Sequence, residues 1–111
     1  MIIIYGRDKT KQEFNNHKLL TQRYGSKMAK VIRRRLDDLD AADNLEVMRN
    51  LPGRCHELKG ERKGQLSIDL VHPERLVFVP AHDPVPLKED GGIDWKRVTS
   101  IKIIEVVDTH E

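Results

Sequence analysis

Residues 65–79 read QLSIDLVHPERLVFV, and this stretch determines what kind of domain the chain forms. Leu66, Ile68 and Leu70 alternate with polar residues, which is the period of a strand with one buried face. His72-Pro73-Glu74 then predicts a turn, and the apolar run at 75–79 predicts a second strand. Two strands joined by a short turn predict an antiparallel pair.

The residues before and after this pair predict further strands and, towards the N-terminus, helices. Met28, Val31, Ile32, Leu36 and Leu39 recur at helical spacing and form one apolar stripe. The predicted strand over residues 1–6 is almost entirely apolar, so we expect both of its faces to be covered. We expect strands over 1–6, 55–58 and 101–108, and helices over 9–15, 17–24 and 27–41, with Gly25 ending the second helix.

This order of elements predicts an α+β domain. We expect a small antiparallel sheet of about four strands plus an N-terminal strand, with two or three helices packed on one face. Residues 1–111 are expected to form a single domain. An excursion at about 81–100 interrupts the second half of the chain, and Ile93 and Trp95 are the residues expected to anchor it.

Charge is unevenly distributed along the chain, although the formal net charge is only +2. Six basic residues and no acidic one lie within 23–35, whereas five acidic residues and no basic one lie within 37–46. Such blocks predict a dipolar surface with one side suited to polyanions. Lys27, Lys30 and Arg34 fall opposite the apolar stripe, on a face that either lines RNA or is simply solvated.

The composition argues against several classes of protein. Cys55 is the only cysteine, so no intramolecular disulfide can form, which fits a reducing cytosol. No apolar run reaches the length of a membrane span, and we expect a cytoplasmic protein without membrane contact. The histidines and the cysteine lack metal-ligand spacing, and phosphate-loop and dinucleotide-binding motifs are absent, so we expect neither metal nor cofactor.

The densest group of chemically useful side chains lies in residues 54–64, RCHELKGERKG. His56 can transfer a proton because its unperturbed pKa lies near neutrality. The alternative is an ordinary solvated hairpin loop, since charged turns are common. Four cations that can hold phosphate oxygens surround the turn: Arg54, Lys59, Arg62 and Lys63.

A second group of candidates lies in and after the C-terminal strands. Asp108 and His110 stand where a strand end can present an imidazole, although a terminal histidine can equally be a frayed surface residue. Arg75 either binds phosphate on an open sheet surface or pairs with Asp69 or Glu74.

Helix-turn-helix DNA binding is the main competing fold-level interpretation. Residues 22–35 cross Gly25 and can form two helices joined by a tight turn. The strand-rich second half is not typical of such a domain.

Two motifs in this chain together resemble those of a known family. LPG at 51–53 followed by HELKGERKGQLSI at 56–68 is similar to the signature of HigB-like toxins, the plasmid maintenance killer proteins of the RelE/ParE superfamily. That signature is Leu-Pro-Gly followed by His-x-Leu-Lys-Gly-[Asp/Glu]-Arg-x-Gly-x-Trp-Ser-Ile. VDTH at 107–110 resembles the family's Asp-Tyr-His ending.

The chain departs from the family pattern in three places. Leu66 replaces the usual tryptophan, and Thr109 replaces the usual tyrosine, which removes a stacking ring and a phenolic proton donor. The 81–100 excursion is absent from the shorter family members.

The resemblance implies a RelE-like fold and a ribosome-dependent mRNA endoribonuclease that uses no metal. In that reaction the RNA 2′-hydroxyl attacks its own phosphodiester, while the enzyme positions the RNA, transfers protons and neutralises charge. By matching position, the resemblance implies catalytic roles for His56, Arg75, Asp108 and His110. The residues expected to bind RNA are Arg54, Lys59, Arg62, Lys63, Lys27, Lys30 and Arg34.

The resemblance also implies a type II toxin–antitoxin system. The expected partners are a HigA-type helix-turn-helix antitoxin, the ribosome and its mRNA, and the toxin–antitoxin complex is expected to bind operator DNA. Two alternatives stay open. One is a non-catalytic toxin on the same scaffold that acts by binding a protein, as gyrase poisons do, and the other is a DNA-binding antitoxin or repressor.

Overall fold

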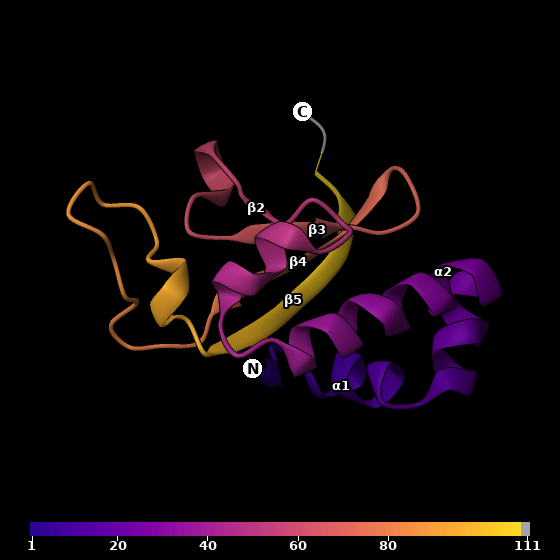
Figure 1. Cartoon of the computed structure of the whole chain (residues 1–111). Helices are drawn as coiled ribbons and strands as arrows, with labels where there is room; N and C mark the ends of the chain where they lie inside the picture. Colours follow the sequence, from indigo (N-terminus) through magenta and orange to yellow (C-terminus); the bar gives the residue numbers. More distant parts are fainter. Residues whose placement is uncertain (110–111) are drawn as a thin grey trace.

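The computed structural model describes residues 1–109 of the chain (Figure 1). In chain order the elements are β1 (Ile2–Tyr5), α1 (Asp8–Phe14), α2 (His17–Ala41), the 3₁₀ helix η1 (Leu45–Asn50), β2 (His56–Glu57), the 3₁₀ helix η2 (Gly60–Arg62), β3 (Leu66–Asp69), β4 (Glu74–Pro80), the 3₁₀ helix η3 (Trp95–Arg97) and β5 (Ser100–Asp108). Strands β2 to β5 lie in the second half of the chain, and the two α-helices lie in the first half.

The strands form one sheet in the order β1-β5-β4-β3-β2. Strands β2 to β5 pair antiparallel with their neighbours, and β1 pairs parallel with β5. The predicted pair at 65–79 is β3 and β4, with Leu66 opposite Phe78 and Asp69 opposite Arg75. The predicted α+β fold, with about four antiparallel strands plus an N-terminal strand, is confirmed.

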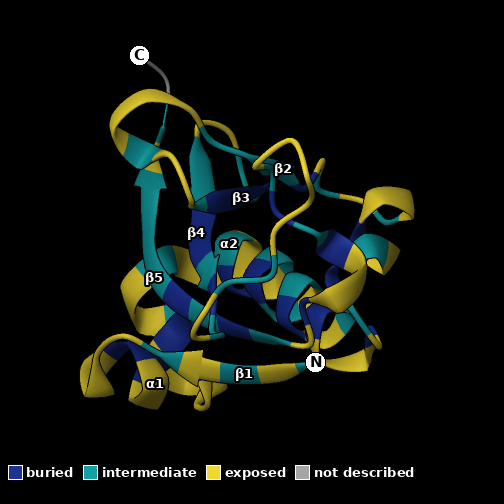
Figure 2. Cartoon of the chain, turned by 90° about the vertical axis from the view of Figure 1, so that its left-hand side faces the viewer, coloured by how far each residue is buried: buried dark blue, intermediate teal, exposed yellow. Residues whose placement is uncertain are grey.

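The core lies between the sheet and the two helices, which pack on one of its faces (Figure 2). Ile32, Leu36 and Leu39 of the predicted stripe are buried, and each contributes about 2 kcal/mol of burial energy. Met28 and Val31 pack at the margin of the core. The sheet supplies the facing side chains Leu66, Ile68, Leu76, Phe78, Ile101 and Ile103.

Helix α2 is kinked at Gly25, the position where sequence predicted one helix to end. Gly25 has φ 83° and ψ 162°, a backbone conformation that glycine adopts at little steric cost. Asn16 caps the helix, because its side-chain oxygen accepts a hydrogen bond from the Leu19 amide at 3.2 Å. Among the helices of residues 1–109, none combines the length with the apolar character that a membrane crossing requires.

Strand β1 differs from expectation. Its two faces were predicted to be covered, yet Ile2 is 66% exposed and Ile4 is 43% exposed. The reason is its place at the edge of the sheet, where α1 and α2 cover only the side on which Ile3 and Tyr5 pack. Strand β3 differs in the opposite sense, because Ser67 on its predicted solvent face is fully buried.

The excursion between β4 and β5 is held to the body by the two predicted anchors. Ile93 and Trp95 are buried, and Ile93 forms an isolated antiparallel bridge with Leu87. Figure 1 shows this segment (orange) extending from the end of the sheet that lies away from α2. The excursion therefore forms a fixed wall beside the β2–β3 hairpin.

Candidate active site

Strand register brings several polar side chains to the face of the sheet that points away from the helices. His56 lies opposite Ser67, Ser67 opposite Val77, and Val77 opposite Glu105. Residues directly opposite each other in antiparallel strands point to the same side. We call this side the far face; its residues are His56, Ser67, Asp69, Arg75, Val77 and Glu105.

Arg75 lies on the far face and is bound from two sides. Its Nε is 3.2 Å from Asp69 Oδ1, and one terminal nitrogen donates a hydrogen bond to Thr109 Oγ1 at 2.8 Å. The other oxygen of Asp69 accepts a hydrogen bond from Arg54 Nε at 3.2 Å. One carboxylate thus holds two guanidinium groups, which leaves an excess of positive charge at this end of the face. Of the two alternatives that the sequence left open for Arg75, the structure shows the ion pair with Asp69.

His56 is oriented by the backbone next to it. Its Nδ1 is 2.8 Å from the carbonyl oxygen of Arg54. A carbonyl can only accept, so Nδ1 is the donor, and in the neutral form of the ring Nε2 carries the lone pair. Arg54 itself has φ 52°, in the left-handed region. The imidazole can therefore accept a proton at Nε2 and return it later.

Arg62 extends from the hairpin turn to β5. Its guanidinium donates to Gln65 Oε1 at 2.9 Å and to Glu105 Oε1 at 3.3 Å. Lys59 and Lys63, on either side of η2, are exposed and form no ion pair within residues 1–109. The turn thus supplies one tethered cation and two free cations.

Sequence reasoning missed Ser67 and Glu105. The Oγ of Ser67 is buried, with no hydrogen-bond partner within residues 1–109, and it lies between His56 and Val77 on the far face. Ser67 looked like an ordinary solvent-facing residue of an alternating strand. Glu105 had a detectable signal, because it is the lone acidic residue in the apolar run 101–107.

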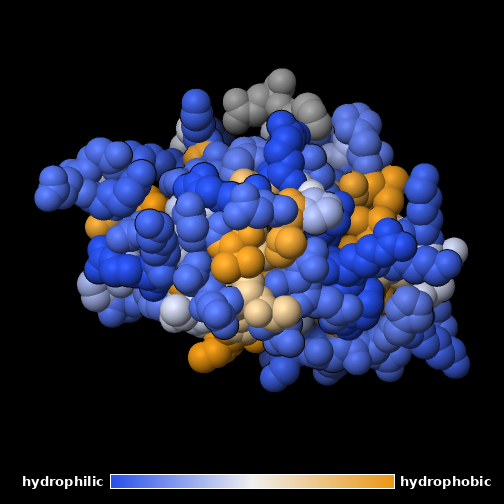
Figure 3. All heavy atoms as spheres, in the orientation of Figure 1, coloured by the Kyte–Doolittle hydropathy of each residue, from blue (hydrophilic) through white to orange (hydrophobic). Residues whose placement is uncertain are grey.

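The remaining candidates lie in different places. Asp108 is exposed at the end of β5, opposite Glu74, and His110 lies outside the described residues. Lys27, Lys30 and Arg34 are exposed on the outer side of α2, so the helix layer and the sheet separate them from His56. The surface over α1 and α2 is mostly hydrophilic (Figure 3). The structure therefore does not bring the basic helix face together with the far face.

The only cysteine is not a nucleophile in this fold. Burial raises the pKa of the Cys55 thiol from 9.0 to about 12, although the charge of Arg49 lowers it in part. The thiolate needed for nucleophilic attack is therefore scarce near neutral pH. Within residues 1–109 no three His, Cys, Asp or Glu side chains cluster in a way that could hold a metal ion.

Comparison with known proteins gives a fold. No protein-family model matches the chain, and no curated protein matches it. A YoeB/ParE toxin from Agrobacterium tumefaciens is 14% identical, with a TM-score of 0.58, over 99% of this chain and all of that one. In the YoeB–YefM complex from Staphylococcus aureus the match is 19% identical, with a TM-score of 0.55, over 100% of this chain and 98% of that chain.

A third match, the YoeB dimer from Staphylococcus aureus, is 22% identical, with a TM-score of 0.53 and the same coverage as the complex. At these identities the likeness is one of backbone architecture over the full length. The chain therefore has the backbone fold of the YoeB/ParE toxins.

Proposed function

We propose that the protein is the toxin of a type II toxin–antitoxin system and acts as a metal-free, ribosome-dependent mRNA endoribonuclease of the HigB-like branch. One observation carries the proposal: His56, with Nε2 available, shares the far face with Arg75 in a fold that solved toxins also have. A proton carrier beside a phosphate-binding cation is the minimum that cleavage of RNA by its own 2′-hydroxyl requires.

Each residue has a role in this proposal. Nε2 of His56 moves the proton at the ribose 2′-hydroxyl, while Arg75 and Lys59 neutralise charge on the phosphate. His110 serves as the partner acid or base, and Asp108 orients it. Arg75 donates a hydrogen bond to Thr109, the residue that precedes His110 in the sequence.

RNA docking is assigned to two separate surfaces. Arg54, Arg62 and Lys63 border the far face and would hold the RNA near the reacting bond. Lys27, Lys30 and Arg34, on the outer side of α2, would contact a second RNA segment of the ribosome. The protein would act in the cytoplasm, restrained by a HigA-type antitoxin, and the complex of the two would bind operator DNA.

The proposal is tested by expressing the protein with both imidazoles removed. His56→Ala combined with His110→Ala should abolish growth arrest and the cleavage of mRNA in a translating extract, while circular dichroism shows an unchanged fold. Growth arrest by the double variant would contradict the mechanism.

A second candidate is a toxin on the same scaffold that poisons a protein such as DNA gyrase. The favouring observation is that Arg75 is already occupied by Asp69 and by Thr109, which stands where the family has tyrosine. Growth arrest with intact mRNA and inhibited gyrase would establish this alternative. The helix-turn-helix alternative loses its structural basis, because the chain has the YoeB/ParE toxin fold.

A further inference from the structure

We propose that the cleft between the free edge of β2 and the excursion binds an extended peptide segment of a protein partner as an added β-strand, with carboxylates alternating with apolar side chains. This binding does not depend on RNA cleavage, although Lys59 and Lys63 belong both to this cleft and to the proposed RNA site. The residues that line the cleft include Leu58, Lys59, Lys63, Val85, Leu87 and Ile93, together with the acidic residues Glu57 and Asp90.

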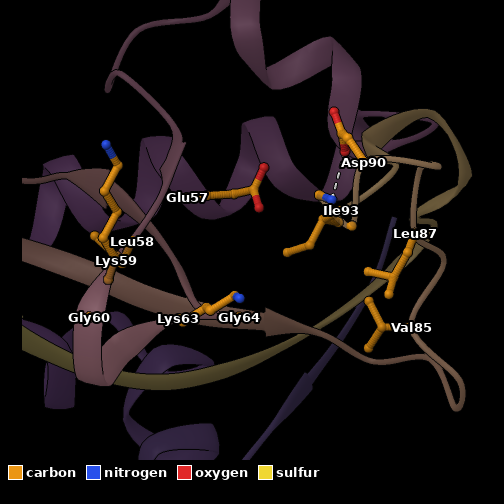
Figure 4. A pocket seen from close by; sticks show the side chains of 12 residues that line it. Glu57, Leu58, Lys59, Gly60, Lys63, Gly64, Val85, Leu87, Asp90 and Ile93 are labelled. Carbon is orange, nitrogen blue, oxygen red and sulfur yellow. Dashed lines mark hydrogen bonds between the residues drawn. The ribbon is translucent and has the colours of Figure 1, made fainter.

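The cleft has the size and lining of a recognition site. Its volume is about 770 Å³, within the range of sites that hold small ligands or peptide side chains. Figure 4 shows the hairpin turn on one side, with Lys59 and Lys63, and Val85, Leu87 and Ile93 of the excursion on the other. Leu87 is 51% exposed, so an apolar surface is available to a partner.

The edge of β2 offers unpaired backbone groups to this cleft. The Leu58 amide donates to the Gln65 carbonyl at 2.9 Å, and His56 pairs with Ser67 two residues along. In an antiparallel pair only alternate residues bond inward. The N–H and C=O of Glu57 therefore point away from β3, and within residues 1–109 neither has a backbone or side-chain partner. A strand of another chain would satisfy both groups.

The opposite wall of the cleft is already in place. Trp95 Nε1 donates a hydrogen bond to Glu57 Oε2 at 3.0 Å, and the Arg49 guanidinium lies 3.7 Å from the centre of the Trp95 ring. Arg97 donates to the Leu87 carbonyl at 2.9 Å, which fixes the excursion further along. A ligand entering a preformed groove loses less free energy to ordering the protein.

The lining favours a peptide over single-stranded RNA. Proteins that bind unpaired bases stack them on aromatic or arginine side chains, and none lines this cleft, since Trp95 is buried in its wall. Aliphatic walls beside a free strand edge suit alternate apolar side chains of an extended peptide. Glu57 and Asp90 also line the cleft, but Glu57 accepts a hydrogen bond from Trp95 and Asp90 pairs with Lys88. Lys59 and Lys63 form no ion pair within residues 1–109, so these two unpaired cations favour acidic residues in that peptide.

The test uses the full-length protein and a blocked ten-residue peptide that alternates valine with glutamate. Binding should change the fluorescence of Trp95, the only tryptophan. It should slow hydrogen exchange of the Glu57 amide by about tenfold or more at saturation, while the Leu58 amide, already bonded, changes little. A peptide with lysine in place of glutamate should bind at least about tenfold more weakly.

Variants separate the cleft from other apolar surfaces. Leu87→Glu should abolish peptide binding, and Leu19→Glu, at a comparably exposed leucine on α2, should leave it unchanged. Lys59→Glu combined with Lys63→Glu should transfer the preference to the lysine peptide. Unchanged thermal unfolding temperatures would show that each variant is folded.

Three outcomes would overturn the proposal. They are the absence of binding at millimolar peptide, protection of the β1 amides in place of Glu57, and a ten-nucleotide RNA that protects Glu57 at lower concentration than the peptide does.

Discussion

Asp69 is the residue that holds the far face together. Its side chain binds Arg54 and Arg75, and its backbone carbonyl accepts a hydrogen bond from Arg35 of α2 at 2.8 Å. A single residue thus ties the sheet to the helix layer on one side and positions two cations on the other. The candidate site depends on such contacts more than on any local motif.

Cys55 provides a titration that reports on folding. In the unfolded chain the thiol ionises at its ordinary pKa of 9.0, whereas burial holds the folded pKa near 12. Below pH 9 the thiol is neutral in both the folded and the unfolded state. Between pH 9 and the folded pKa, the thiol ionises only in the unfolded chain, and this ionisation stabilises the unfolded state. The free energy of unfolding should therefore fall by about 1.4 kcal/mol per pH unit between these pKa values.

Urea unfolding at several pH values across that range measures this slope. The variant Cys55→Ala should show a slope smaller by that amount, because other titrating groups are common to both proteins. Equal slopes in the two proteins would mean that the thiol ionises as easily in the folded state.

Gly53 is a position where a side chain has no room. Its φ is 111°, and an added Cβ would lie 2.5 Å from Cγ1 of Ile68. Gly64 has a similar φ of 91° but open space around it. Gly64→Ala should destabilise the protein by about 1–2 kcal/mol through backbone strain alone.

Gly53→Ala should lower the free energy of unfolding by about 2 kcal/mol more than Gly64→Ala does, because the core side chains around Ile68 must also shift. Chemical denaturation of both variants measures the difference. Equal losses would show that Ile68 moves aside freely.

Among the elements, the excursion is tied to β2 by a hydrogen bond from its tryptophan. Trp95→Phe keeps the apolar ring but removes the donor to Glu57 Oε2. A hydrogen bond to a charged acceptor contributes about 1.5–3 kcal/mol to stability. Because Glu57 is only half-buried, we expect Trp95→Phe to lower the free energy of unfolding by an amount near the lower end of that range. Hydrogen exchange should increase mainly in residues 85–97.

Glu57→Gln is the matched variant, because it keeps a hydrogen-bond acceptor and removes the charge. It should lower the free energy of unfolding by less than Trp95→Phe does. A larger loss for Glu57→Gln would contradict the assigned role of the indole donor.

Most elements could be predicted from sequence because periodicity is a local property. The apolar stripe of α2 and the alternation in β3 identify those elements directly, and glycine marked the kink at position 25. The exposure of β1 could not be predicted, because it depends on which strand ends at the edge of the sheet.

The candidate site could be predicted only in part. Chemistry-bearing side chains such as His56 and Arg75 stand out by residue type. The contacts of Arg62 with Glu105, and the burial of Ser67, follow from strand register, which pairs residues far apart in the chain. Local patterns carry no information about that register.

In the whole molecule, basic charge is divided between two surfaces on opposite sides. If the outer side of α2 contacts ribosomal RNA, Lys27→Glu combined with Lys30→Glu should weaken ribosome binding. The slope of the logarithm of the binding constant against the logarithm of the salt concentration should also become shallower by about one for each lost cation. Sedimentation with ribosomes at several salt concentrations measures both quantities.

Lys9→Glu combined with Lys96→Glu changes the net charge equally and serves as the control. Equal weakening by the two pairs would show that net charge, and not the α2 surface, drives association.

The proposed catalytic role of the far face is tested most directly by measuring mRNA cleavage by a His56 variant. Single-turnover cleavage on programmed ribosomes should fall by about 10²–10⁴-fold in His56→Ala, the range expected when a proton-transferring group is removed. His17→Ala, at an exposed histidine of α2, should cleave at the wild-type rate. If His56→Ala also cleaves at the wild-type rate, the far face is not the catalytic site.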